Sequence, residues 1–178
     1  MAENENSPEN LDNNAASGEQ AQAQSFAIRT VYLKDCSFES PNTPAIFSQN
    51  MQPKINVNVN SGASNVQENL HEVVLTLSVT AQFENDDKTV FHSEVQQAGL
   101  FESQGLDPQQ LHQLLGTFAP SQLFPYAREA VNNLINKGGF QSVPLQPINF
   151  DALYVQHMQQ LADQQQAAAG QNPPQGNA

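Results

Sequence analysis

The chain has 178 residues, enough for one folded domain with a substantial core but not for two large ones. Its 18 Asp and Glu outnumber its 6 Lys and Arg, giving a formal net charge of −12, so few cations are available to bind nucleic acid or an anionic membrane. No apolar run approaches the roughly 18–20 residues of a membrane span, which argues against membrane insertion, and the acidic first residues do not form a secretory signal.

Both ends of the chain are predicted to be disordered tails. Residues 1–25 carry Asp and Glu but no Lys, Arg, aromatic or β-branched residue, so they cannot bury enough apolar surface to offset their conformational entropy. Residues 164–178 are rich in Gln, Ala and Asn, and Pro173 ends any helix that enters them. We therefore expect one folded domain at residues 26–163.

Strand signals fill the first half of that domain. Residues 26–38 are rich in β-forming residues, and residues 55–60 alternate strictly between apolar residues and Asn. Residues 72–83 place apolar side chains on one face and polar side chains on the other. The turn at 84–87 leads into residues 89–95, which predict the return strand of a hairpin. The pattern predicts four antiparallel strands.

Helix signals follow the strands. Asp107, followed at once by Pro and Gln, is a typical helix N-cap. Pro120 is expected to end that helix and Ser121 to begin a second one, which closes with Gly138 at its C′ position. Asn149 is placed to cap a third helix. Strands first and helices after predict an α+β fold, a four-stranded antiparallel sheet with the helices packed on one face.

The apolar content exceeds what an isolated domain of this kind would hide. The segment between the first two strands, residues 41–53, is long and contains large apolar side chains, which is typical of functional or interface loops. The second helix carries a broad apolar stripe that we assign to an oligomer interface, with core as the other possibility: Leu123, Phe124, Ala127, Val131 and Leu134. Self-association is the simpler explanation of the surplus, and binding of a client protein is the more specific one.

No pattern of residues supports an enzyme or a metal site. The four histidines have no metal-ligand spacing with one another or with Cys36, and no glycine-rich phosphate loop is present. We expect no catalytic residue, no metal and no cofactor; an enzyme with a pocket between sheet and helices stays a third hypothesis. Cys36 is the only cysteine, so no disulfide forms within the chain, which fits a reducing cytoplasm.

Acidic residues on the predicted strands are the main charged feature. Asp35 and Glu39 are four residues apart in an extended segment, so their side chains point to the same face. Glu94 and Glu72 lie on the fourth and third predicted strands. If they share the open face of the sheet, they form an anionic patch. A solvated polar face is the more common outcome, and a docking surface for a basic partner is the functional alternative.

Four segments resemble the signature motifs of the SecB family of protein-export chaperones. In chain order they are residues 32–42 (YLKDCSFESPN), 94–101 (EVQQAGLF), 123–129 (LFPYARE) and 147–154 (PINFDALY). The resemblance covers about residues 26–163. Four motifs in the right order make a chance match improbable.

The resemblance implies a SecB-like sheet with helices behind it, assembled as a dimer of dimers, a homotetramer. It also implies ATP-independent holding of unfolded precursor proteins in the bacterial cytoplasm and their delivery to the SecA motor. The acidic SecA-docking positions of the family match Asp35, Glu39 and Glu94. The family often has an apolar residue where this chain has His92. A chaperone of the same fold dedicated to one partner, such as a toxin–antitoxin controller, is the alternative.

The resemblance places the client-binding groove between the crossover at residues 41–53 and the last helix at residues 150–161. The groove residues in this chain would be Ile46, Phe47, Met51, Phe150, Leu153, Tyr154 and Met158. A Trp often stands at the position of Met51, and Met offers a soft, adaptable surface that suits promiscuous binding.

Overall fold

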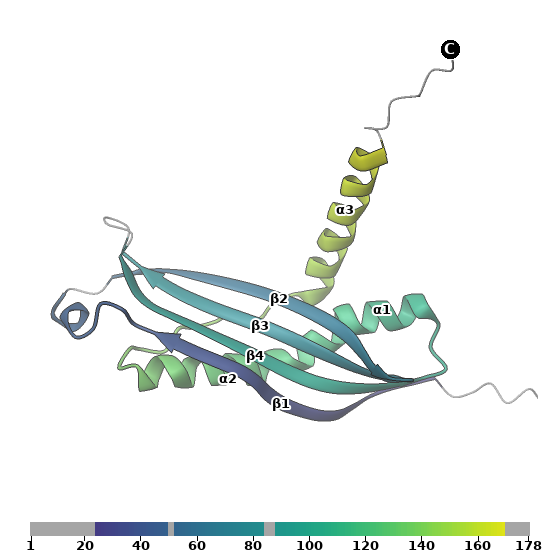
Figure 1. Ribbon diagram of the computed structural model, residues 1–178, viewed down its shortest axis with the longest axis horizontal. Helices are drawn as coiled ribbons and strands as arrows, with labels where there is room; N and C mark the ends of the chain where they lie inside the picture. The colour runs from purple at the N-terminus through teal and green to yellow at the C-terminus, as the bar shows by residue number, and fades with distance from the viewer. Residues whose placement is uncertain (1–23, 50–51, 84–87, 170–178) are drawn as a thin grey trace, which may run out of the picture.

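The computed structural model describes residues 24–49, 52–83 and 88–169, which form four strands, a short 3-10 helix and three α-helices (Figure 1). Their bounds are β1 Ser25–Glu39, η1 Ala45–Ser48, β2 Lys54–Gln67, β3 Leu70–Gln82, β4 Thr89–Gln104, α1 Pro108–Gly116, α2 Phe118–Lys137 and α3 Phe150–Ala169.

The strands form one antiparallel sheet in the order β1-β4-β3-β2. The predicted fold class is confirmed. β1 and β2 are therefore the edges, and the segment that joins them carries η1 beyond one end of the sheet (Figure 1). β2 and β4 are longer than predicted, because residues of low strand propensity are held by their ladders to neighbouring strands.

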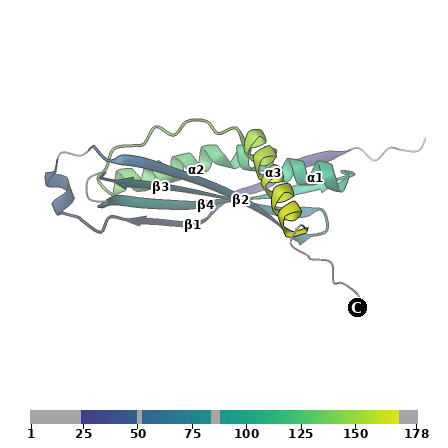
Figure 2. The same cartoon turned by 90° about the horizontal axis from the view of Figure 1, so that it is seen from above.

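The core lies between the sheet and α2. Alternate residues of β3 are buried on the face toward α2, from His71 to Ala81. Figure 2 shows α1 and α2 on that side of the sheet, which we call the core face. The opposite side is the open face. α3 instead projects away near the β2 edge (Figure 1), and from residue 151 to 164 only Tyr154 is not exposed.

The apolar stripe of α2 is core in the single chain, which corrects its assignment to an oligomer interface. Leu123, Ala127 and Val131 are fully buried, and Phe124 is nearly so. Leu134 is partly buried against the same cluster. α2 packs on β3 and β4, and a regular apolar stripe has the same sequence pattern whether it faces its own sheet or a second copy.

The helix boundaries differ from prediction at two places. The break between α1 and α2 comes at Thr117, whose backbone is not helical (φ −122°, ψ −66°), and Pro120 lies in the first turn of α2, where its missing N–H breaks no helical hydrogen bond. At the end of α2, Gly138 stays helical, and the left-handed conformation falls on Gly139 (φ 86°).

The predicted caps of α1 and α3 are confirmed. The Asp107 side chain accepts a hydrogen bond from the backbone N–H of Gln110 at 2.8 Å, and the Gln110 side chain returns toward the N-cap backbone. Asn149 Oδ1 accepts from the backbone N–H of Ala152 at 3.0 Å. These local signals fix where the two helices that border the candidate site begin.

Candidate functional site

The open face of the sheet carries the predicted acidic residues. Direct cross-strand neighbours share a face, and Glu94 is opposite a half-buried residue of β3 that alternates with its core positions. Glu39 is opposite His92, two places before Glu94, and Asp35 is opposite the residue two places after it. The three carboxylates therefore lie on one face, and together we call them the acidic patch.

Within the described residues, the acidic patch has no ion-pair partner. The two salt bridges found there join Lys34 to Glu72 and Arg29 to Glu102. The Lys34 Nζ and Arg29 Nε are 2.8 Å and 2.7 Å from their nearest carboxylate oxygens. The cations of these two residues are therefore matched by carboxylates outside the patch, which leaves a concentration of negative charge on two adjacent strands.

Glu72 lies on the open face but is neutralised by its neighbours. Lys34 Nζ donates to both of its carboxylate oxygens at 2.8 Å, and the Tyr32 hydroxyl donates to Oε1. The hydrogen bond from Lys34, and then the one from Tyr32, lowers the pKa of Glu72 below its ordinary value. The same carboxylate raises the pKa of Tyr32 to about 12. Glu72 therefore does not extend the acidic patch.

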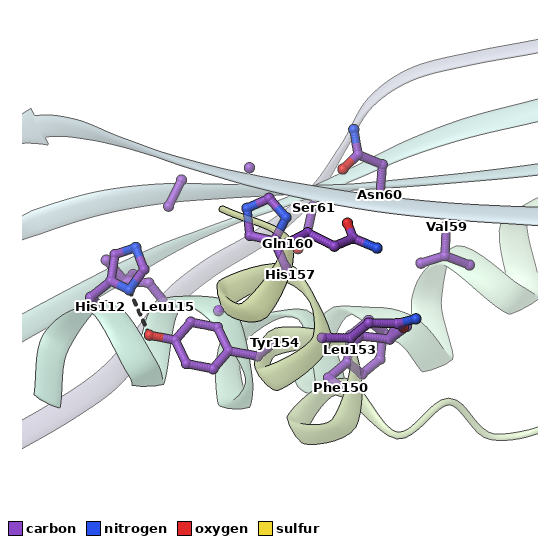
Figure 3. A pocket seen from close by; sticks show the side chains of 14 residues that line it. Val59, Asn60, Ser61, His112, Leu115, Phe150, Leu153, Tyr154, His157 and Gln160 are labelled. Atoms are coloured by element: carbon purple, nitrogen blue, oxygen red, sulfur yellow. Dashed lines mark hydrogen bonds between the residues drawn. The ribbon is translucent and has the colours of Figure 1, made fainter. Parts of the chain in front are cut away.

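A cavity of about 400 Å³ opens between β2, α1 and α3 (Figure 3). Its walls combine apolar side chains with Asn, Gln and His side chains, and contain no Asp, Glu, Lys or Arg. α3 supplies Phe150, Leu153, Tyr154 and His157, and Leu115 comes from α1. Such a lining suits an uncharged occupant that offers both apolar and hydrogen-bonding groups.

An uncovered apolar row of β2 leads into this cavity. Ile55, Val57 and Val59 alternate on the core face, opposite buried residues of β3. α2 packs mainly on β3 and β4, and Ile55 and Val57 remain 37% and 45% exposed. Val59 lines the cavity. We call these three residues the β2 apolar row.

The α3 half of the predicted groove comes together at the cavity. Phe150, Leu153 and Tyr154 all line it. Phe150 is nearly buried, whereas Leu153 is 42% exposed. Met158 lies further along α3 and is exposed, but it is not part of the lining.

The crossover half of the predicted groove lies elsewhere. Ile46 is fully buried in the core. Phe47 is half exposed and packs on Phe140 with ring centroids 5.2 Å apart. η1, which contains both, lies beyond the end of the sheet that is remote from α3 (Figures 1 and 2). Met51 lies outside the described residues. The structure therefore does not join the two halves into one pocket.

Tyr154 fixes the start of α3 against α1. Its hydroxyl lies 2.7 Å from His112 Nδ1, the hydrogen bond drawn in Figure 3. Its ring fills the space above Gly116, where a Cβ would stand 2.5 Å from Tyr154 Cδ2. Only glycine at position 116 allows this close approach. No local sequence pattern predicts this contact, because its partners lie on two helices separated by the whole of α2.

Apart from the acidic patch and the cavity, the described residues offer little that points to another kind of site. No group of three or more His, Cys, Asp and Glu in these segments could hold a metal ion. No helix in the same segments is long and apolar enough to cross a membrane. Cys36 is exposed and free on the edge strand β1.

The chain matches a known protein family over most of its length. A family model described as preprotein translocase subunit SecB matches residues 19–161. A protein-export protein SecB of Hahella chejuensis is 51% identical over 144 residues, which cover 81% of this chain and 89% of the relative. Another, of Methylococcus capsulatus, is 48% identical over 143 residues, 80% of this chain and 91% of the relative.

A solved structure shares the fold. It is the SecB-like chaperone of Mycobacterium tuberculosis in complex with a ChAD peptide from an antitoxin, with a TM-score of 0.56 and 17% identity. The match covers 69% of this chain and 90% of that one. The family match spans the whole sheet, α1, α2 and the first turns of α3. The chain therefore belongs to the SecB family of protein-export chaperones.

Proposed function

We propose that the protein is a chaperone of the bacterial cytoplasm that binds unfolded precursor proteins without ATP, keeps them competent for translocation and delivers them to SecA. It has no enzymatic activity in this proposal. Family membership supports the role in export. The observation that carries the client-binding step is the β2 apolar row, which stays uncovered in the folded chain and runs into an uncharged cavity.

The β2 apolar row suits an extended, unfolded segment. β2 is an edge strand, so its outer backbone N–H and C=O groups can pair with an added strand while apolar client side chains cover Ile55 and Val57. Each square ångström of apolar surface buried contributes about 25 cal/mol, and ordering the client offsets much of that gain. Many weak contacts along one client are therefore the expected mode of binding.

The acidic patch is the proposed docking surface for SecA. Asp35 and Glu39 are exposed and Glu94 is half-buried, all on the rigid β1–β4 pair. Unpaired carboxylates on a fixed backbone favour encounter with a basic partner and set its orientation. His92 takes the family's apolar position beside Glu94, and its Nδ1 lies 2.8 Å from Thr80 Oγ1.

The homotetramer is proposed from apolar side chains exposed on the core-face side. They come from the β1 edge and from the outer side of α2: Ile28, Leu33, Phe118 and Tyr126. A single chain leaves them in water, and a second copy packed over the helices would bury them.

The client site is tested by the refolding of a slow-folding precursor without ATP. Excess chaperone should delay refolding, and Val57→Ser should weaken that delay severalfold because it places a hydroxyl in the β2 apolar row. Val66→Ser is the matched control, since Val66 is on the same strand and similarly exposed at 50% but lies outside the row and the cavity lining. A refolding rate unchanged by excess wild-type protein would count decisively against the proposal.

A chaperone dedicated to one partner is less well supported. The SecB-like chaperone bound to an antitoxin peptide shares only 17% identity with this chain, whereas relatives at 51% and 48% are named protein-export proteins. Binding to several unrelated unfolded precursors would separate the two functions, since a dedicated chaperone would bind one.

A further inference from the structure

Lys34 is a cation placed directly beside the acidic patch. Neighbouring residues of a regular strand point to opposite faces, but the β1 register is shifted between Leu33 and Asp35. Such an irregularity lets two successive residues share a face. Lys34 reaches Glu72 on the open face, the face that also carries Asp35. A free Lys34 ammonium would therefore be within reach of the patch.

Glu72 holds that ammonium at a distance from the patch. Lys34 Nζ lies 2.8 Å from both Glu72 carboxylate oxygens, and the Glu72 side chain is only 16% exposed. Tyr32 donates a further hydrogen bond that fixes the carboxylate. Glu72 lies six residues along β3 from Ser78, which is opposite Glu94, a separation of about 20 Å. The Lys34 side chain is thus drawn along the sheet, away from Glu94.

We propose that Glu72 determines the specificity of the docking face by holding Lys34 away from the acidic patch, so that a basic partner meets the patch without a competing cation. This inference rests on the proposed docking of SecA by the patch. Glu72 acts through Lys34 and is a positioning residue; it need not touch the partner. Without it, Lys34 pairs with the carboxylate of Asp35 or Glu94 and competes with the partner's own cations.

The test compares binding of purified SecA to four full-length chains by calorimetry at low salt. Glu72→Gln should weaken binding about two- to fivefold, the range expected when a surface ion pair competes. Glu102→Gln is the matched control: it also removes one carboxylate from an ion pair on the open face. It frees Arg29, whose place on β1 is level with Leu100 and Phe101 of β4, six to seven residues along the strand from Glu94 and about 20 Å away. It should bind almost as wild type.

The fourth chain distinguishes the proposed mechanism from direct contact. Glu72→Gln combined with Lys34→Gln should restore wild-type affinity, because the competing cation is gone. If binding stays weak in the double variant, Glu72 contacts the partner or supports the fold, and the inference is overturned. Equal binding by wild type and Glu72→Gln overturns it as well. Circular dichroism verifies that each variant is folded.

A separate variant tests the proposed docking of SecA independently of the role of Glu72. Reversal of the patch by Asp35→Lys, Glu39→Lys and Glu94→Lys should abolish SecA binding while the fold persists. Undiminished binding in that variant removes the patch, and with it both the docking proposal and the role of Glu72. Loss of binding in that variant together with a neutral Glu72→Gln leaves the docking proposal standing and rejects only the inference.

Discussion

Single hydrogen bonds across strands decide which charges the open face presents. Tyr32 on β1 and Glu72 on β3 are separated by β4, yet the hydroxyl of one donates to the carboxylate of the other. The carboxylate favours the protonated phenol, and the cation of Lys34 favours the ionised carboxylate. Tyr32 therefore stays protonated and Glu72 stays ionised around neutral pH.

A titration of phenol absorbance at 295 nm should reveal this arrangement. One of the three tyrosines is expected to ionise near pH 12 instead of 10, because Glu72 raises the pKa of Tyr32 to about 12. A raised pKa means that the hydrogen bond stabilises the fold fully below pH 10 and that this contribution is lost as the pH rises toward 12. Tyr32→Phe should remove the late step, and Glu72→Gln should move it back toward 10. A late step that survives in Tyr32→Phe would contradict the assignment.

The positions of the acidic patch could be predicted from the sequence, but the pairing of Glu72 with Lys34 could not. A period of two placed Asp35 and Glu39 on the same face, and the register confirms this because the irregularity of β1 falls before Asp35. Glu72 also shares that face. Its pairing with Lys34, 38 residues away on a strand that is not adjacent, depends on sheet order, which local periodicity does not contain.

At the scale of elements, the sequence predicted which segments are helices or strands and how the helices are capped. It predicted less well how long the strands are and in which direction α3 runs. The caps of α1 and α3 depend on residues three apart and could be identified locally. The length of β2 depends on its ladder to β3, and the direction of α3 depends on a few contacts near its start. The cavity could not be predicted, because β2, α1 and α3 are distant in sequence and meet only in the folded sheet.

The contact between α1 and α3 should be sensitive to one methyl group. In Gly116→Ala the new Cβ would lie 2.5 Å from a Tyr154 ring carbon, so the ring must move and the hydrogen bond to His112 is strained. We expect faster hydrogen exchange in the first turns of α3, even though Ala favours a helix by about 1 kcal/mol over Gly.

Gly62→Ala is the control for that change. Gly62 also lines the cavity, but a Cβ there meets nothing within 4 Å, so exchange in α3 should not change. Replacing Tyr154 with Ala should abolish the difference between Gly and Ala at position 116. An α3 equally protected in wild type and Gly116→Ala would show that Tyr154 does not fix the helix.

For the whole molecule, sequence patterns located only part of the exposed apolar surface: Phe47, Leu153 and Met158 are exposed, as a client groove requires, but the stripe of α2 is not. Periodicity identified the stripe of α2, which the sheet buries in the single chain. The exposed large apolar side chains lie on the β1 and β2 edges, on the outer side of α2, along α3 and on η1. α2 packs mainly on β3 and β4 and only lightly on the edge strand β1, so the edges of the sheet are covered less than its centre, which is a property of the three-dimensional fold.

Light scattering measures the mass of the assembly in solution, and so tests whether the exposed apolar side chains are buried between chains. We expect a mass near four chains, since the exposed apolar groups of the core-face side need partners and the net charge of −12 opposes unspecific association. Tyr126→Glu puts a charge on the outer side of α2, where Tyr126 is 52% exposed, and should lower the mass to two chains or one. Asn58→Glu adds the same charge to an exposed residue of the open face and should leave the mass unchanged. A wild-type mass of one chain would rule out the tetramer, and dissociation by both variants would show that added charge alone, and not the helix layer, controls assembly.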